Sequence, residues 1–298
     1  MSERTHEITT LLSGLAMGES ARWHDGRFWC SDWVAGEILA TEVAGSAAGR
    51  SEVAARSTSF PFCFDWTPDG TMLVTGGSGL ERLEPAPAGS AGGAGEGKLV
   101  PHVDLSPLGP QVWNEVVVDP RGNAYVNSPN FDMSGGFDVE VGSRSGVVAL
   151  VTPGGDVRTV ATEVAFPNGM AVAPDGSTLI VAESFASRLG AWDIDADGTL
   201  SNRRVWAPLE NGCDGIGIDA EGAVWVATQK GCERVREGGE VADRIPFDLF
   251  GFSCALGGPE GRTLFMVAAD WQGYENIGKR PRTGVVYAAE VEVPAPGW

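Results

Sequence analysis

The chain of 298 residues carries 40 acidic against 21 basic side chains, a formal net charge of −19. Nucleic acids and anionic membrane surfaces both attract clustered Lys and Arg, so this balance argues against either as a partner. The N-terminal segment lacks a basic stretch followed by an apolar one, and no run approaches the ~18 apolar residues of a membrane-spanning helix. We therefore expect a cytoplasmic protein with no signal peptide.

Five cysteines are scattered along the chain, and no two form a C-x-x-C pair. An odd, dispersed set is typical of a reducing compartment rather than of a disulfide framework or a thiolate zinc site. We expect one of them, Cys213, to be a buried structural thiol.

A short unit recurs along the chain, in which a turn ending in glycine precedes an apolar strand. In chain order it reads HDGRFWCSD, PDGTMLVTGG, PRGNAYVNS, PDGSTLIVAES, AEGAVWVATQ and PEGRTLFMVAA, with turn glycines at Gly26, Gly70, Gly122, Gly176, Gly222 and Gly261. Such turns join antiparallel strands. A short apolar segment such as EVVVD or GIGID precedes each turn, and a third strand such as SGVVALVTP or SRLGAWDID often follows.

Repetition of this unit predicts an all-β fold, a six-bladed β-propeller with four-stranded antiparallel blades. We expect one domain over residues 1–298, with the two chain ends meeting in one blade so that the ring is closed. A sandwich or a β-helix would not explain why the unit occurs six times.

Two of the units carry insertions between their second and third strands, at residues 127–145 and 270–283. The aromatic residues of these insertions are Phe131, Phe137, Trp271 and Tyr274. We expect them to form a lid or a pocket wall, because functional residues concentrate in such loops. A stretch rich in Gly, Ala and Ser at 88–97 predicts a flexible surface loop.

Alignment of the units on their turn glycines brings a set of polar residues into register. The positions eight residues before each glycine are Phe62, Asn114, Asn168, Asp214 and Ser253, and Glu19 lies seven residues before Gly26. The first strand of each propeller blade lines the central channel, so these positions should surround its mouth. Buried polar groups need partners, and one shared cation would satisfy four of them together.

The oxygen atoms of this set suit a hard cation. The three histidines (His6, His24 and His102) all lie outside the set, which argues against a His-rich zinc site. Carboxylate and amide oxygens prefer Ca²⁺, Mg²⁺ or Mn²⁺. We expect one divalent cation, Ca²⁺ first, with Zn²⁺, Mn²⁺ or Mg²⁺ as alternatives. The same groups could instead only hydrogen-bond neighbouring backbone.

Five stretches carry a resemblance that covers essentially the whole chain. They are GESARWHDGRFWCSDW from Gly18, WNEVVVDPRGNAYV from Trp113, FPNGMAVAPDGSTLIVAES from Phe166, CDGIGIDAEGAVWVA from Cys213, and the segment from Ser253 to Trp298. Through them the chain resembles the senescence marker protein/gluconolactonase/luciferin-regenerating enzyme family. The resemblance implies a six-bladed propeller with one divalent cation held by Glu19, Asn168 and Asp214. It also implies that Asn114 contacts the substrate, close enough to be a further ligand.

The sequence departs from the sugar-lactonase pattern on both sides of Asn114. Where those relatives have an Arg two residues before it and an Asp directly after it, this chain has Val112 and Glu115. The Arg that would bind sugar hydroxyls is missing. We therefore expect a substrate less polar than a sugar lactone, bound near Trp113 and Phe62.

The expected activity is metal-dependent hydrolysis of a small lactone or ester. The sequence has no G-x-S-x-G motif and no His placed to serve a serine nucleophile. The cation would polarise the carbonyl and activate attack by water. Asp214 would be ligand and general base, or a nucleophile, and Asn114 would orient the carbonyl.

Three alternatives remain open at this point. One is phosphotriester hydrolysis at the same site, and another is a metal- or ligand-binding propeller without turnover. The third is a condensing enzyme of the same fold, which is weakened because such enzymes lack these metal ligands. The quaternary state is expected to be a monomer or a homodimer.

Overall fold

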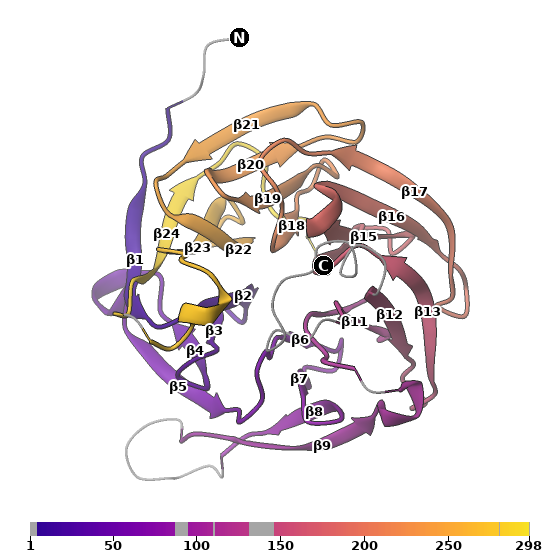
Figure 1. Cartoon of the computed structure of the whole chain (residues 1–298). Coiled ribbons are helices and arrows are strands. Elements are labelled where there is room, and N and C mark those ends of the chain that lie inside the picture. The colour runs from indigo at the N-terminus through magenta and orange to yellow at the C-terminus, as the bar shows by residue number, and fades with distance from the viewer. Residues whose placement is uncertain (1–4, 87–94, 110, 131–145, 280, 298) are drawn as a thin grey trace.

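The computed structural model describes residues 5–86, 95–109, 111–130, 146–279 and 281–297. Within these ranges the strands form six four-stranded antiparallel sheets, arranged as blades around a central channel (Figure 1). The predicted six-bladed β-propeller is therefore confirmed. Of the helices in the part of the chain that the structure describes, none is both long and apolar enough to cross a membrane.

Each blade runs from an inner strand to an outer strand. Blade one contains β2 (Gly18–His24), β3 (Arg27–Asp32), β4 (Glu37–Thr41) and β5 (Ser51–Arg56), and blade two contains β6 (Phe64–Trp66), β7 (Met72–Gly76), β8 (Gly79–Glu84) and β9 (Lys98–Asp104). Blade three contains β10 (Val116–Val118), β11 (Ala124–Ser128), β12 (Gly146–Val151) and β13 (Val157–Val164), and blade four contains β14 (Pro167–Val172), β15 (Thr178–Glu183), β16 (Arg188–Ile194) and β17 (Leu200–Pro208). Blade five contains β18 (Ile216–Ile218), β19 (Val224–Thr228), β20 (Gly231–Val235) and β21 (Val241–Pro246).

Blade six joins the two ends of the chain. It contains β22 (Phe250–Gly257), β23 (Thr263–Ala269), β24 (Gly284–Glu290) and, as its outer strand, β1 (Thr9–Leu15). The first strand pairs antiparallel with the last, from Thr9 opposite Ala288 to Leu15 opposite Gly284. This pairing closes the ring, as the sequence predicted.

The turn between the first two strands of each blade explains why the glycine recurs. All six predicted turn glycines adopt positive φ angles, which side-chain-bearing residues rarely tolerate. In blade one both Asp25 (φ 48°) and Gly26 (φ 74°) are left-handed, as a two-residue hairpin turn requires. The repeated sequence unit is therefore a repeated turn.

The apolar core lies between neighbouring blades. One cluster joins Tyr125, Val148 and Leu150 of blade three to Met170, Leu179 and Trp192 of blade four. Similar clusters fill the other interfaces, and burial of these faces is the main stabilising contribution at ~25 cal/mol per Å². The inner strands meet around the axis, where β2 contacts β22 and β14 contacts β18.

Short 3₁₀ helices interrupt the loops: η1 (Gly45–Ala47), η2 (Ser106–Leu108), η3 (Ser184–Ala186) and η4 (Tyr274–Asn276). The insertion at 270–283 joins β23 to β24, as predicted. The insertion at 127–145 joins β11 to β12, but its part with Phe131 and Phe137 lies outside the described residues. The same holds for most of the loop at 88–97 and for the Tyr274 side chain.

Candidate metal centre and active site

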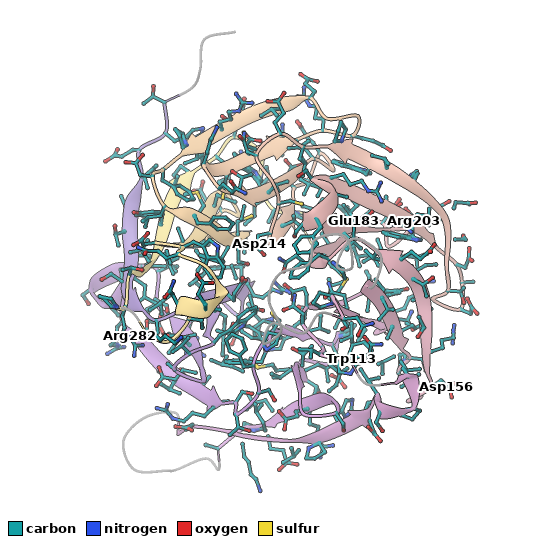
Figure 2. The ribbon with its side chains drawn as sticks, viewed as in Figure 1. Trp113, Asp156, Glu183, Arg203, Asp214 and Arg282 are labelled. Atoms are coloured by element: carbon teal, nitrogen blue, oxygen red, sulfur yellow. The ribbon has the colours of Figure 1, made fainter. Side chains whose placement is uncertain are left out.

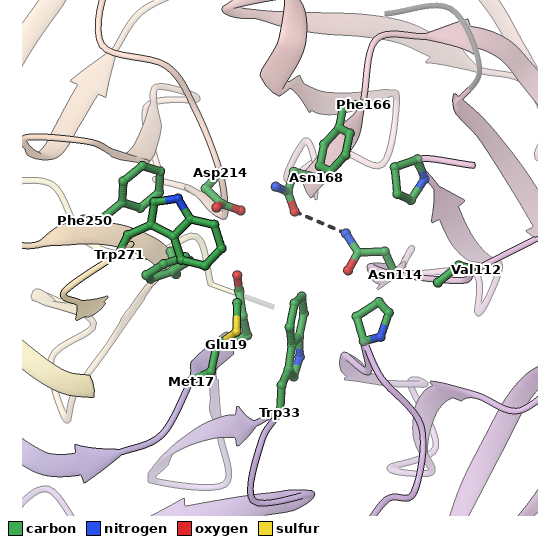
Figure 3. Close-up of a pocket in the computed structure, with 13 residues that line it drawn as sticks. Met17, Glu19, Trp33, Val112, Asn114, Phe166, Asn168, Asp214, Phe250 and Trp271 are labelled. Carbon is green, nitrogen blue, oxygen red and sulfur yellow. Dashed lines mark hydrogen bonds between the residues drawn. The ribbon is translucent and has the colours of Figure 1, made fainter. Parts of the chain in front are cut away.

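Four polar side chains from four blades meet at the mouth of the central channel. Glu19 lies on β2 and Asn168 on β14, while Asn114 and Asp214 lie two residues before the inner strands of blades three and five. All four line one cavity of about 80 Å³ (Figure 3). Glu19 and Asn114 are each 5% exposed and Asp214 is 9% exposed. The structure therefore brings together the four residues that the sequence placed in register.

Hydrogen bonds between neighbouring blades hold these residues at the mouth. Thr75 Oγ1 donates to the Asn114 carbonyl (2.8 Å), Asn127 Nδ2 to the Asn168 carbonyl (2.7 Å), and Gly169 N to the Asp214 carbonyl (3.1 Å). The other three blade junctions are bridged by Ser20 with Phe64, by Gly215 with Phe252 and by Ala21 with Ser253. Neighbouring blades are thus linked all the way round the channel by bonds from their inner and second strands, which fixes the backbone of the candidate ligands.

The glycines after Asn168 and Asp214 allow the inner strands to approach closely. A Cβ atom on Gly169 would lie 2.5 Å from the Ile216 nitrogen, and one on Gly215 would lie 2.6 Å from the Ser253 Cα. Both distances are shorter than real contacts allow, and the obstructing atoms are backbone. In each Asn-Gly or Asp-Gly pair, the first residue is therefore a candidate metal ligand. The glycine after it lets the neighbouring inner strand pack closely.

Two buried oxygens at the mouth accept no hydrogen bond from the described residues. Asn114 Nδ2 donates to Asn168 Oδ1 (3.2 Å), and Asn168 Nδ2 donates to Ser184 Oγ (3.4 Å). Asn114 Oδ1 and Asp214 Oδ1 are left as buried acceptors without a donor. A buried acceptor without a partner costs roughly 1–3 kcal/mol, so these atoms indicate a ligand.

The electrostatics of the mouth favour a cation. Burial raises the pKa of the Glu19 carboxyl well above its ordinary value, and the carboxylates of Asp214 and Glu115 raise it further. Burial likewise raises the pKa of Asp214, with Glu115 adding to the effect. No Lys, Arg or His is among the described residues that line the cavity.

The donor atoms at the mouth suit a divalent cation. Glu19, Asp214 and the two asparagines supply only oxygen, which is the donor set of a hard cation. No group of three or more His, Cys, Asp and Glu that could hold a metal occurs in the described ranges, so amide oxygens must complete the set. The residues fit Ca²⁺, Mg²⁺ or Mn²⁺ better than a soft metal.

The rest of the cavity wall is apolar. It is formed by Met17, Trp33, Pro61, Val112, Pro129, Phe166, Phe250, Phe252 and Trp271. Trp271 comes from the insertion at 270–283, so the prediction that this aromatic residue contributes to a pocket wall is confirmed (Figure 3). Val112, at the position of the absent Arg, faces the cavity with an apolar side chain.

Phe62 and Trp113 do not line this cavity. Phe62 is fully buried and Trp113 is 4% exposed, and each belongs to an apolar core cluster. Successive residues of an extended segment face opposite sides, so Val112 and Asn114 face the cavity while Trp113 faces the core. Phe62 supports the wall through its carbonyl, which accepts a hydrogen bond from Trp33 Nε1 (2.6 Å). The predicted contact of Phe62 and Trp113 with substrate stays a prediction.

Several wall residues were not predicted, although the sequence held a signal for some of them. Met17 and Val112 each lie two residues before a polar position of the ring, and this spacing places side chains on the same side of an extended chain. Phe166 has the same offset from Asn168 but a left-handed backbone (φ 56°). Trp33 and Phe250 lie at no such offset, and only the folded ring brings them to the mouth.

A second charged cluster lies farther along the inner strands. Arg22 Nη2 donates to Glu115 Oε1 (2.8 Å) and to the Val116 carbonyl (2.9 Å), and its Nε lies 3.8 Å from Asp65 Oδ1. Glu115, which replaces the expected Asp, therefore pairs with a guanidinium inside the protein and does not line the cavity.

Two curated relatives are hydrolases by name. The chain is 29% identical over 126 residues to diisopropyl-fluorophosphatase of Loligo vulgaris. The aligned region covers 39% of this chain and 40% of that protein. It is 27% identical over 177 residues to the pentonolactonase XacC of Haloferax volcanii, which covers 57% of each chain. The matched part of the chain thus spans about half the length of these curated relatives.

Solved structures and the matched region place the chain in a family. A luciferin-regenerating enzyme superposes with a TM-score of 0.79 at 17% identity, covering 98% of this chain and 97% of that one. The calcium-binding protein regucalcin of Agrobacterium tumefaciens gives a TM-score of 0.72 at 20% identity, covering 95% and 92%. These likenesses show the fold alone. Residues 17–270 match the SMP-30/gluconolactonase/LRE-like region, and the chain therefore belongs to the SMP-30/gluconolactonase/LRE-like family.

Proposed function

We propose that the protein is a hydrolase that depends on a divalent cation and opens a lactone or ester less polar than a sugar lactone. One observation carries the proposal. Two buried carboxylates and two amides, with buried acceptor oxygens on Asn114 and Asp214, converge at the end of an apolar cavity. The gluconolactonase-like family and the pentonolactonase relative support the same class of reaction.

Glu19, Asn168 and Asp214 would hold the cation through oxygen. Calcium is the first candidate because the set is all oxygen, and a calcium-binding regucalcin shares the fold. Mg²⁺, Mn²⁺ and Zn²⁺ are the alternatives. A bound cation supplies Lewis-acid polarisation of the substrate carbonyl and charge to stabilise the developing oxyanion.

The protein's own groups supply the proton transfer and the orientation. Asp214 faces the cavity with an oxygen that accepts no hydrogen bond from the described residues, so it is positioned to take a proton from the attacking water. Asn114 Nδ2, which bonds Asn168 with one hydrogen, has a second hydrogen to orient the substrate carbonyl. The aromatic wall excludes bulk water, which strengthens these interactions.

Phosphotriester hydrolysis at the same site is the second candidate. The sequence match to diisopropyl-fluorophosphatase favours it, because that match is as strong as the match to the lactonase. The same cation and the same carboxylate would serve attack on a phosphoryl centre.

The test is a substrate panel assayed with protein stripped by a chelator and then reloaded with Ca²⁺, Mg²⁺, Mn²⁺ or Zn²⁺. Lactone hydrolysis that disappears on stripping and returns with one cation supports the proposal. Turnover of phosphotriesters alone would favour the second candidate. Tight cation binding with no turnover of either class would point instead to a metal- or ligand-binding propeller.

The setting of the enzyme is part of the proposal. All five cysteines are buried free thiols, which supports the cytoplasm as its location. The partner is a small-molecule lactone or ester, and the assembly is a monomer or a homodimer, which light scattering on purified protein distinguishes.

A further inference from the structure

A second cavity of about 210 Å³ adjoins the candidate active site under the insertion at 270–283. The two cavities share Met17, Phe252 and Trp271 as wall residues. In Figure 3, Met17 and Trp271 lie on the side of the site that carries Glu19 and Asp214. The two cavities therefore adjoin at these three side chains.

The insertion that covers this cavity is fixed to the neighbouring blade. Arg282, near the end of the insertion, donates from Nη2 to Asp32 Oδ2 (2.9 Å) and from Nε to the Gly14 carbonyl (2.6 Å). Asp32 is fully buried and also accepts the backbone nitrogens of Ala16 (2.8 Å) and Met17 (3.0 Å). The same carboxylate thus holds the insertion in place and orients the wall between the two cavities.

Several polar groups around the second cavity already bond one another or the neighbouring blade. Gln272 Nε2 donates to Asp270 Oδ2 (2.5 Å), and Asn276 Nδ2 donates to the Gln272 carbonyl (2.7 Å). The guanidinium of Arg282 is likewise engaged. The remaining side chains that line the cavity include Val34, Ala269 and Ile277 together with the shared Met17, Phe252 and Trp271, all of them apolar or aromatic.

We propose that the second cavity binds a hydrocarbon substituent of the substrate, so that the preferred substrates are lactones bearing an alkyl chain. This inference rests on the proposed function of the adjoining site. A polyhydroxylated ring would place part of its hydroxyls against the apolar and aromatic side chains of this wall, which costs binding free energy. An alkyl chain instead gains from burial of each methylene, about fourfold in affinity per CH₂.

The first experiment compares γ-butyrolactone, γ-octalactone and γ-dodecalactone as substrates of the cation-loaded full-length protein. We expect kcat/KM to rise steeply from the first to the second lactone and to level off when the cavity is full. Equal kcat/KM values for all three lactones would overturn the inference and leave the proposed function standing.

A matched pair of variants localises the effect. Val34 lines the second cavity and is 38% exposed, while Val205 on β17 is 56% exposed and lines neither cavity. Val34→Asp should lower the ratio of kcat/KM for γ-octalactone over γ-butyrolactone by about tenfold or more, because burial of a charge opposes burial of the chain. Val205→Asp should keep the parent ratio. Equal ratios in the two variants would place the alkyl chain of the substrate outside the second cavity and overturn the inference.

Direct binding separates failure of the cavity from failure of the chemistry. The corresponding γ-alkyl lactams resist hydrolysis, and calorimetry measures their affinity without turnover. Affinity that rises with chain length in the parent and not in Val34→Asp supports the cavity even if no lactone is hydrolysed, and then only the proposed function fails. Affinity that is flat or undetectable for every lactam overturns the cavity.

Discussion

Two pairs of carboxylates among the described residues lie along the central channel, and they differ in their cationic partners: Asp65 and Glu115 contact Arg22, whereas Glu19 and Asp214 line a cavity with no described basic side chain. Farther along the inner strands, Asp65 and Glu115 face the Arg22 guanidinium, which opposes the rise that burial imposes on their pKa values. At the mouth, burial raises the pKa values of Glu19 and Asp214, and the Asp214 carboxylate raises that of Glu19 further. No basic side chain among the described residues lines their cavity.

The difference shows how a structural cluster can be distinguished from a ligand site. Buried charges persist only when they are paired, so a pair of carboxylates needs a cation from one of two sources. Arg22 provides it for the deeper pair within hydrogen-bonding distance of Glu115. The Asp214 oxygen at the mouth accepts no hydrogen bond from the described residues, which supports the proposal that there the cation comes from solution.

The largest effect is expected when the carboxylate at the mouth loses its basicity. Asp214→Asn keeps an oxygen for the cation but removes the base, so kcat should fall by about 10²–10⁴-fold while KM changes little. Steady-state kinetics on a lactone that the parent protein hydrolyses checks this, with the metal content measured for every preparation. The control is Cys213→Ser, whose buried thiol we expect to matter only for stability. If Asp214→Asn keeps its metal and turns over within about threefold of the parent, Asp214 is a ligand alone.

Removal of the built-in cation should affect folding. Arg22→Met leaves the buried Glu115 and the partly exposed Asp65 without their partner, and the loss of one member of a buried ion pair typically costs about 3–5 kcal/mol of unfolding free energy. Arg56→Met is the matched control, because the Arg56 side chain is 51% exposed and pairs with Glu37 at the surface, where ion pairs contribute about 0–1 kcal/mol. Urea denaturation compares the two variants. Equal losses would mean that the deeper cluster is no more important for folding than a surface pair.

Addition of a cation from solution should stabilise the mouth. With the free cation at about 100 times its dissociation constant, the unfolding free energy of the stripped protein should rise by about 2.7 kcal/mol. Glu19→Ala should abolish this rise, and Glu84→Ala, at a surface carboxylate 51% exposed, should preserve it. Thermal unfolding with and without Ca²⁺, Mg²⁺, Mn²⁺ and Zn²⁺ measures the effect. Unchanged unfolding with all four cations would contradict a metal centre.

The two clusters also differ in how far the sequence predicts them. Glu19, Asn168 and Asp214 lie at nearly the same offset from a turn glycine, and because a blade repeats its backbone, equal offsets become neighbouring positions in space. The Arg22 cluster has no such signal, since Glu115 lies 93 residues away and meets Arg22 only after three blades have packed. The repeat therefore predicts backbone positions, and non-repeating contacts between blades decide where individual side chains point.

Phe62 shows that an equal offset from a turn glycine does not fix the direction of a side chain. It has the same offset from its glycine as Asn114, but its side chain is fully buried in the core while Pro61 lines the cavity. The second cavity was not predictable for a related reason, because the insertion that covers it belongs to no repeat. Its position depends on the contact of Arg282, labelled in Figure 2, with Asp32, which lies 250 residues away in the sequence.

The smallest expected effect distinguishes the two roles open to Asn114, whose Oδ1 at the mouth, like Asp214 Oδ1, has no donor in the described part of the chain. If Asn114 orients the substrate through Nδ2, Asn114→Ala removes one neutral hydrogen bond and should lower kcat/KM by only about two- to tenfold, partly through KM. Its metal content should equal that of the parent, because Glu19, Asn168 and Asp214 remain.

Asn114→Asp is the sharper variant, since it keeps an oxygen and adds a third carboxylate beside Glu19 and Asp214. That variant should bind the cation more tightly. Its kcat/KM should still fall as far as that of Asn114→Ala, because it no longer donates from Nδ2. Loss of the cation in Asn114→Ala, with full recovery of activity in Asn114→Asp, would assign Asn114 to the ligands and leave the orientation of the carbonyl to another group.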